Sequence, residues 1–141
     1  MHVWLHLLVT KRCPSTLSGW ASECRKVNIG APVYYGSLVY DIDYVCSPGD
    51  PAQIYFNTPP SGGSGNYTYQ WYYQNGLVNC PTGSSTSGWT VISGANADNY
   101  NPPTGLLTSR TYACLVTATA GSGCAASSGW ASQCRQEYVS G

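Results

Sequence analysis

The residues of this sequence best able to do chemistry are its cysteines, seven among 141 residues. Zinc-binding cysteines come in short paired spacings, which are absent here, so disulfides in an oxidising compartment are the expected chemistry. We expect one disulfide across each of two hairpins, each contributing about 3 kcal/mol for loops of this size. The expected pairs are Cys13 with Cys24 and Cys124 with Cys134.

Three cysteines remain, and an odd number leaves at least one thiol without a partner in the chain. Cys80 could pair with Cys114, in which case Cys46 is unpaired. Cys46 is then either a buried free cysteine, which we favour, or a link to a neighbouring subunit.

Metal binding and catalysis find little support in the other polar residues. Asp41 and Asp43 share a strand face and could bind calcium, but Ca²⁺ needs six to eight oxygens and no third carboxylate is near in sequence. His2 and His6 are expected to be solvated terminal histidines. Because both histidines lie in the first six residues, no Ser-His-Asp triad can be assembled. We expect no enzyme activity and no cofactor.

Aromatic side chains offer a second kind of site, because their faces stack on sugar rings. The chain has twelve tyrosines and one phenylalanine, so most tyrosines must serve the core and the sheet surface. Asn66 begins the sequence Asn66-Tyr67-Thr68, which is an N-glycan acceptor pattern and makes it the glycosylation candidate.

The element around which the chain is organised is an octapeptide that occurs twice. Ser18-Gly19-Trp20-Ala21-Ser22-Glu23-Cys24-Arg25 returns at residues 128–135 with one substitution in eight residues. Trp20 and Trp130 are about one domain length apart, which is the pattern that tandem duplication leaves. We therefore interpret residues 30–141 as one full domain. Residues 1–29 are then the C-terminal hairpin of a preceding repeat or a segment that links subunits.

Charge is scarce and balanced, with six Lys and Arg against six Asp and Glu. Nothing in this composition favours nucleic acid or an anionic membrane surface as a partner. No apolar run approaches the ~20 residues of a membrane span. We expect an extracellular protein, either at the cell surface or in a secreted filament.

The rest of the pattern favours β structure, with short apolar runs, polar turns and no helical periodicity. Strands are predicted at residues 38–46, 53–57, 67–73, 89–92, 99–101, 110–118 and 130–139. Period two places Trp71 at the centre of the core, and Tyr112 faces inward on a later strand. The predicted core aromatics are Trp71, Tyr112, Trp89 and Trp130. The fold class is all-β: an immunoglobulin-like sandwich of two antiparallel sheets, preceded by a β-hairpin that is equivalent to its last two strands.

Several of these runs resemble the PKD-like and Ig-like repeats of very large surface proteins of Bacteroidetes. The resemblance covers residues 38–139 well and residues 5–29 more weakly. It rests on Tyr69-Gln70-Trp71, on residues 88–95, on Tyr100-Asn101-Pro102-Pro103 and on residues 110–114. It implies a spacer or adhesive module without an active site, often exported by the type IX route. The chain departs from an antibody domain at Ile54, where a second core cysteine would sit.

Two functions follow as hypotheses. The first is a structural module of an extracellular filament or surface adhesin, which assembles head to tail with identical subunits or repeats through strand or hairpin complementation. The expected subunit contacts in the first hairpin are Val3, Trp4, Leu5, Leu7, Leu8, Val9 and Trp20. The alternative is a carbohydrate-binding module that uses exposed Tyr and Trp residues.

Overall fold

A computed structural model describes residues 21–25, 32–39, 41–121 and 123–141. The chain divides into two compact units, Met1–Ala31 and Pro32–Gly141. In the first unit only residues 21–25 are described, so the predicted hairpin contacts, His2, His6 and Cys13 lie outside the described residues. Across these ranges every regular element is a β-strand. No helix in them is long and apolar enough to cross a membrane.

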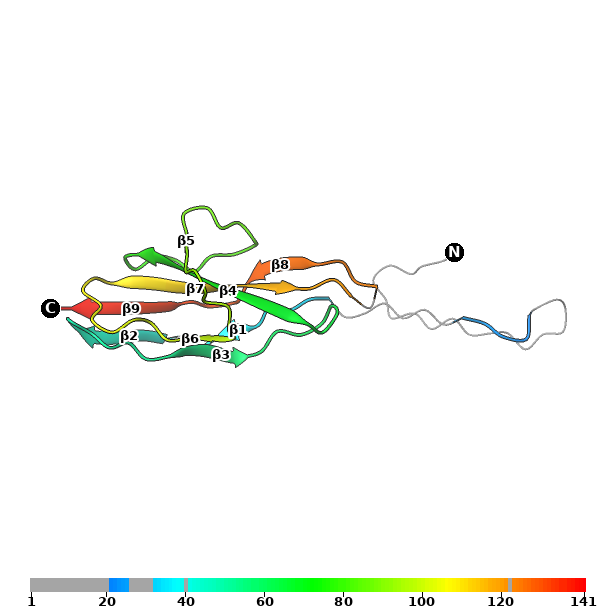
Figure 1. The fold of residues 1–141 in the computed structure, drawn as a ribbon, viewed down its shortest axis with the longest axis horizontal. Helices are drawn as coiled ribbons and strands as arrows, with labels where there is room; N and C mark the ends of the chain where they lie inside the picture. Colours follow the sequence, from blue (N-terminus) through cyan, green and yellow to red (C-terminus); the bar gives the residue numbers. More distant parts are fainter. Residues whose placement is uncertain (1–20, 26–31, 40, 122) are drawn as a thin grey trace. The chain divides into compact units, whose positions relative to one another are not determined.

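The second unit is built from two sheets (Figure 1). The smaller sheet has the order β1-β3-β6, with β1 at Ser37–Leu38, β3 at Ile54–Thr58 and β6 at Asn99–Tyr100. The larger has the order β2-β9-β7-β4-β5, and β8 pairs with β7. Its strands are β2 (Asp41–Cys46), β4 (Tyr67–Asn75), β5 (Thr90–Val91), β7 (Arg110–Ala118), β8 (Ser127–Trp130) and β9 (Arg135–Ser140).

The sequence predicted two antiparallel sheets, but one strand pair of the larger sheet is parallel. β2 pairs with β9 in parallel over six residue pairs, from Asp41 with Arg135 to Cys46 with Ser140. The cause is that the first predicted strand divides between the sheets. Its first part, β1, pairs with β3, and the chain then crosses to lie beside β9.

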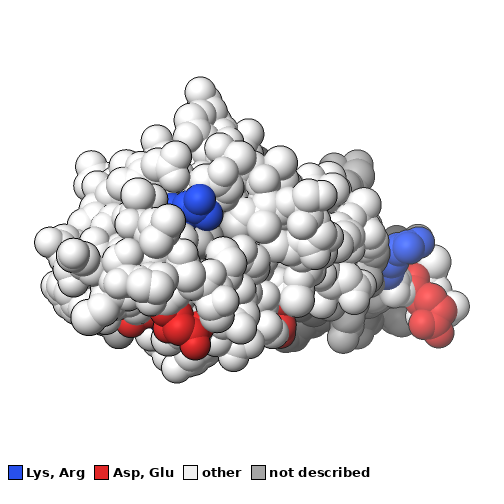
Figure 2. Space-filling model, turned by 60° about the vertical axis from the view of Figure 1, so that its left-hand side comes forward, with Lys and Arg blue, Asp and Glu red and all other residues white. Residues whose placement is uncertain are grey.

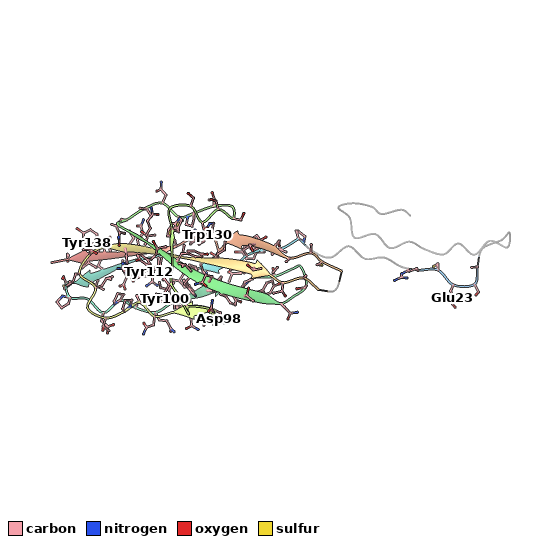
Figure 3. All side chains as sticks on the ribbon, turned by 45° about the horizontal axis from the view of Figure 1, so that its top comes forward. Glu23, Asp98, Tyr100, Tyr112, Trp130 and Tyr138 are labelled. Atoms are coloured by element: carbon pink, nitrogen blue, oxygen red, sulfur yellow. A yellow bond between two sulfur atoms is a disulfide. The ribbon has the colours of Figure 1, made fainter. Side chains whose placement is uncertain are left out.

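The main core lies between the sheets and is centred on Trp71, which is fully buried together with Leu38, Ile54 and Tyr112. The Trp71 ring stacks on Tyr100 with centroids 5.8 Å apart. Alternate residues of β4 and β7 face this core, as the period of two predicts for strands. Figure 3 shows Tyr100 and Tyr112 together in this interior, where their ring centroids are 5.4 Å apart.

A second apolar cluster covers the outer face of the larger sheet. Trp71 pairs with Cys114 on the core face, so the neighbouring pair Tyr72 and Ala113 points the other way. Trp130, 6% exposed, joins Ala113 there, and Trp89 packs on it half-buried. Trp130 is therefore a buried core aromatic, as predicted, but it and the half-buried Trp89 belong to this second cluster and not to the core around Trp71, because the alternation of the strands places them on the opposite face.

Candidate functional site

The repeated octapeptide spans the junction of β8 and β9, and it contains a bulge. Trp130 lies opposite Leu115, whereas Arg135 lies opposite Tyr112. Residues 131–134 therefore face only residues 113 and 114 of β7. Gln133, with φ of 66°, takes the left-handed conformation that turns the chain inside the bulge. The sequence had predicted one continuous strand over 130–139, and this bulge is what interrupts it.

On the outer face, the octapeptide holds down the long loop between β4 and β5. The Trp130 backbone N–H donates to Gly83 O at 2.9 Å, and its indole N–H donates to Ser85 O at 2.9 Å. Cys134 forms a disulfide with Cys80 of the same loop. Trp130, labelled in Figure 3, thus fastens this loop to the sheet.

The observed disulfide corrects two predicted pairs. Cys134 bonds with Cys80, not with Cys124, and Cys114 is a free thiol rather than the partner of Cys80. Burial raises the pKa of Cys114 to about 12, so this thiol stays protonated. The reason for the error is the bulge, which turns Cys134 away from the hairpin and toward the loop. Cys24 is also in a disulfide, and its predicted partner Cys13 lies outside the described residues.

On the inner side, the same octapeptide reaches the other sheet. Ala131 is buried in the main core. Ser132 donates its N–H to Gly36 O at 2.8 Å and accepts from Leu38 N–H at 2.9 Å. Gly129 lies against the ring of Tyr35, where any Cβ would overlap that ring. The octapeptide therefore connects the larger sheet, the smaller sheet and the loop between β4 and β5.

Its last residue, Arg135, forms a buried ionic cluster. Arg135 Nη1 lies 3.9 Å from Asp43 Oδ2 on β2 and 3.5 Å from Glu137 Oε1 on β9. Glu137 is fully buried, and burial raises its pKa to about 8. The nearby Asp43 carboxylate adds to the rise, and Arg135 opposes it. Sequence reasoning missed this cluster, and the only signal for it was an arginine in both copies of the octapeptide.

The first copy of the octapeptide has a different environment. Its residues 21–25 are all exposed, including Ala21, Cys24 and Arg25. Their equivalents in the second copy, Ala131, Cys134 and Arg135, are at most 4% exposed. The same sequence is therefore buried where a sandwich surrounds it and exposed where none of the described residues cover it.

The remaining predicted site residues lie apart from one another. Asp43 accepts a hydrogen bond from Ala52 N–H at 2.8 Å and contacts Arg135, so it is not on a solvated face. The part of the chain that is described contains no cluster of acids, histidines or cysteines suited to a metal ion. Cys46 is free, as expected, but it is exposed rather than buried. Asn66 is exposed at the start of β4, and its glycosylation stays a prediction.

An open groove of about 670 Å³ lies at the free edge of β4. Its lining includes Tyr67 and Tyr69 of β4 and Asn96 and Asp98 of the loop that leads to β6. Asn96 Nδ2 is fixed by Tyr69 O at 3.1 Å and Gln70 Oε1 at 3.0 Å. Figure 2 shows a face with few charged residues, so the domain presents no concentrated charge on that side.

Comparison with known proteins leaves the family open. The chain matches no family of known sequences, no curated protein and no solved structure.

Proposed function

We propose that residues 30–141 are one repeat of an extracellular filament or surface adhesin and that residues 1–29 complete a neighbouring repeat. The repeat is an immunoglobulin-like sandwich of the PKD-like type. The division of the first strand between the sheets, the order β2-β9-β7-β4 and the buried Trp71 beside Cys114 support this topology. The Cys80–Cys134 disulfide suits an oxidising location outside the cell.

The observation that carries the proposal is the contrast between the two copies of the octapeptide. In the second copy, residues earlier in the domain supply many of the contacts that fix the octapeptide, from Tyr35 against Gly129 to Ser85 O on the Trp130 indole. Residues 21–25 of the first copy are exposed, so burying them in the same way would need equivalent groups from another repeat, either earlier in a longer polypeptide or in a neighbouring subunit.

The position of β7, β8 and β9 favours an earlier repeat of the same polypeptide over a neighbouring subunit. These strands occupy the middle and one side of the larger sheet in residues 32–141. An identical complete domain consequently has no open place for a second copy of them. An acceptor for residues 1–29 must lack its own equivalents, which is the situation of a preceding repeat in the same polypeptide.

The course of the chain also suits a linear array. β2 runs parallel to β9, so the chain enters the sandwich at the end opposite to the one where β9 leaves it. Figure 1 shows β9 ending at the C-terminus, at the far end of the sandwich from β8. Domains with this arrangement can follow one another end to end without a long connection.

Two measurements test the proposal. We expect residues 1–141 and residues 32–141 both to be monomeric in analytical ultracentrifugation, and the polypeptide isolated from its source to be far heavier than 15.1 kDa. If hairpin exchange between subunits were the mechanism, residues 1–141 would form concentration-dependent polymers and residues 32–141 would not. A Trp20→Ala variant of the longer chain is the matched control, because it should abolish only that polymerisation. An isolated polypeptide of about 15 kDa that stays monomeric would contradict both forms of the proposal.

The groove beside β4 supports glycan binding as the second candidate function. Its aromatic, amide and hydroxyl groups suit a neutral polyhydroxylated ligand. The rings of Tyr67, Tyr69 and Tyr73 pack against the main core, so they do not form an open platform. Binding on a glycan array that is lost in Asn96→Ala and kept in Asn101→Ala would support this function, and no binding by the folded protein would exclude it.

A further inference from the structure

The cluster around Arg135 lies between an edge strand and the body of the larger sheet. β2 is the edge strand, and within that sheet it is paired only with β9. Asp43 of β2 and Glu137 of β9 are direct partners in the parallel register, so their side chains project on the same side. Both carboxyl groups lie within 3.9 Å of the same nitrogen, Arg135 Nη1.

The two acids differ in the hydrogen bonds that they accept from the protein. Asp43 Oδ2 accepts the Ala52 N–H at 2.8 Å in addition to its contact with Arg135. Neither oxygen of Glu137 accepts a hydrogen bond from the described residues, although both are buried. A buried carboxylate without donors is unfavourable, so Glu137 is the acid of this pair that is expected to hold a proton. The raised pKa of Glu137 has this same cause.

The other charged and titratable groups that face the cluster do not neutralise a second carboxylate. β7 contributes Arg110, opposite Glu137, and Tyr112, opposite Arg135. The Arg110 guanidinium lies over the Tyr73 ring of β4, with Cζ 4.2 Å from the ring centroid. From the smaller sheet, Tyr100 packs on Tyr112 and brings no charge near neutral pH. If Glu137 ionised, two negative charges would therefore share the single contacting cation, Arg135.

The acid at this position is not a requirement of the repeated sequence. Two residues after the shared Arg25 the first copy has Val27, at the place that Glu137 holds after Arg135. At position 137 a valine would supply buried apolar surface without a titratable group. Glu137 is thus a particular feature of this domain.

We propose that a proton held on Glu137, beside Asp43 and Arg135, forms a latch that fastens the edge strand β2 to the sheet in acid and loosens it as the pH rises. Loss of the proton leaves two adjacent carboxylates at the contact between β2 and β9. Their repulsion acts on β2, which as an edge strand has a neighbour on only one side. The rest of the sheet keeps its pairing.

The direction of the pH effect follows from the two states of Glu137. In the closed state its pKa is about 8, and in an open, hydrated state it returns toward 4.5. Opening therefore releases a proton between these values and becomes up to about tenfold more favourable per pH unit. Below pH 4.5 and above pH 8 the dependence is flat, because both states then have the same protonation.

Amide hydrogen exchange of the full 141-residue chain, corrected for the intrinsic rate at each pH, tests the latch. We expect protection of the β2 amides to fall by up to about tenfold per pH unit from pH 5 to pH 8 and to stay below that of the β7 amides at every pH, because β2 can open alone whereas β7 exchanges when the whole domain unfolds. Glu137→Gln and Glu137→Val should both remove this pH dependence, because neither side chain titrates. The second variant has the residue that the first copy carries at the equivalent position, Val27. Asp98→Asn removes an exposed carboxylate and should leave the dependence unchanged.

A titration of the Glu137 side-chain carboxyl by carbon NMR on the unaltered protein decides the question if the variants fail to fold. A midpoint near the ordinary 4.5 in the folded protein would overturn the proposal. Protection of the β2 amides that equals that of the β7 amides at every pH would also overturn it, because β2 would then open only by global unfolding and not as a single strand.

Discussion

Replacement of Cys80 by serine removes the disulfide to Cys134, and the size of its effect can be worked out from the chain it encloses. The two cysteines are 54 positions apart. Closing a loop of that length lowers the entropy of the unfolded chain by about 14 cal/mol/K, which is about 4 kcal/mol at 25 °C. A domain of this size has a total stability of roughly 5–15 kcal/mol, so the loss is a large fraction of it.

Urea unfolding followed by tryptophan fluorescence measures this loss. With a slope near 2 kcal/mol/M, a loss of about 4 kcal/mol lowers the midpoint by about 2 M. Trp130 and Trp89 lie beside the disulfide, so their fluorescence reports the same region. The matched control is Cys124→Ser, because Cys124 is a free thiol and its loss should leave the midpoint nearly unchanged.

The opposite result would refute the reasoning. A bond between Cys124 and Cys134 would close a loop of only about 10 residues and be worth under about 3 kcal/mol. If Cys124→Ser lowered the midpoint and Cys80→Ser did not, the pairing described here would be wrong. Peptide mapping of the non-reduced protein gives an independent check, since it identifies the linked peptides directly.

Three further changes follow from the same region. Gly129→Ala should lower the free energy of unfolding by about 1–3 kcal/mol, because the new methyl group must displace the Tyr35 ring, and an unchanged urea midpoint would contradict this contact. Gln133→Gly should raise stability by up to about 1 kcal/mol, since φ of 66° strains a residue with a Cβ; a fall in the thermal midpoint would count against that. The free energy of unfolding should decline by a few kcal/mol as the pH rises from 4.5 to about 8, because the raised pKa of Glu137 makes its contribution complete only below its unfolded value. A pH series of urea titrations measures this decline, and a stability that is level or rises over that range would contradict it.

The sequence predicted the strands and the central core well where a local period of two decided them. Tyr69 and Trp71 on β4, and Tyr112 and Val116 on β7, alternate with residues that face outward, and the structure places their side chains in or against the main core. This signal is local, because neighbouring residues of a strand must point to opposite faces.

Long-range pairing was much less accessible. The bulge at residues 131–134 has no local signature, and it decides where Cys134 points. The ionic cluster joins Asp43 to residues more than 90 positions later in the chain, and only the tertiary fold brings them together. A residue such as Glu137, on an apolar strand face, looked like an ordinary strand residue until its neighbours were known.

The parallel pairing of β2 with β9 has a mechanical consequence. When such a domain is stretched by its two termini, the load passes from the short strand β1 into β2 and leaves through β9. Because β2 and β9 run in the same direction, the force acts along them, and all six residue pairs are sheared together instead of being unzipped one by one. Once the sandwich yields, the Cys80–Cys134 bond keeps the residues between them from being drawn out. A protein built from these units would resist tension and extend only in short steps.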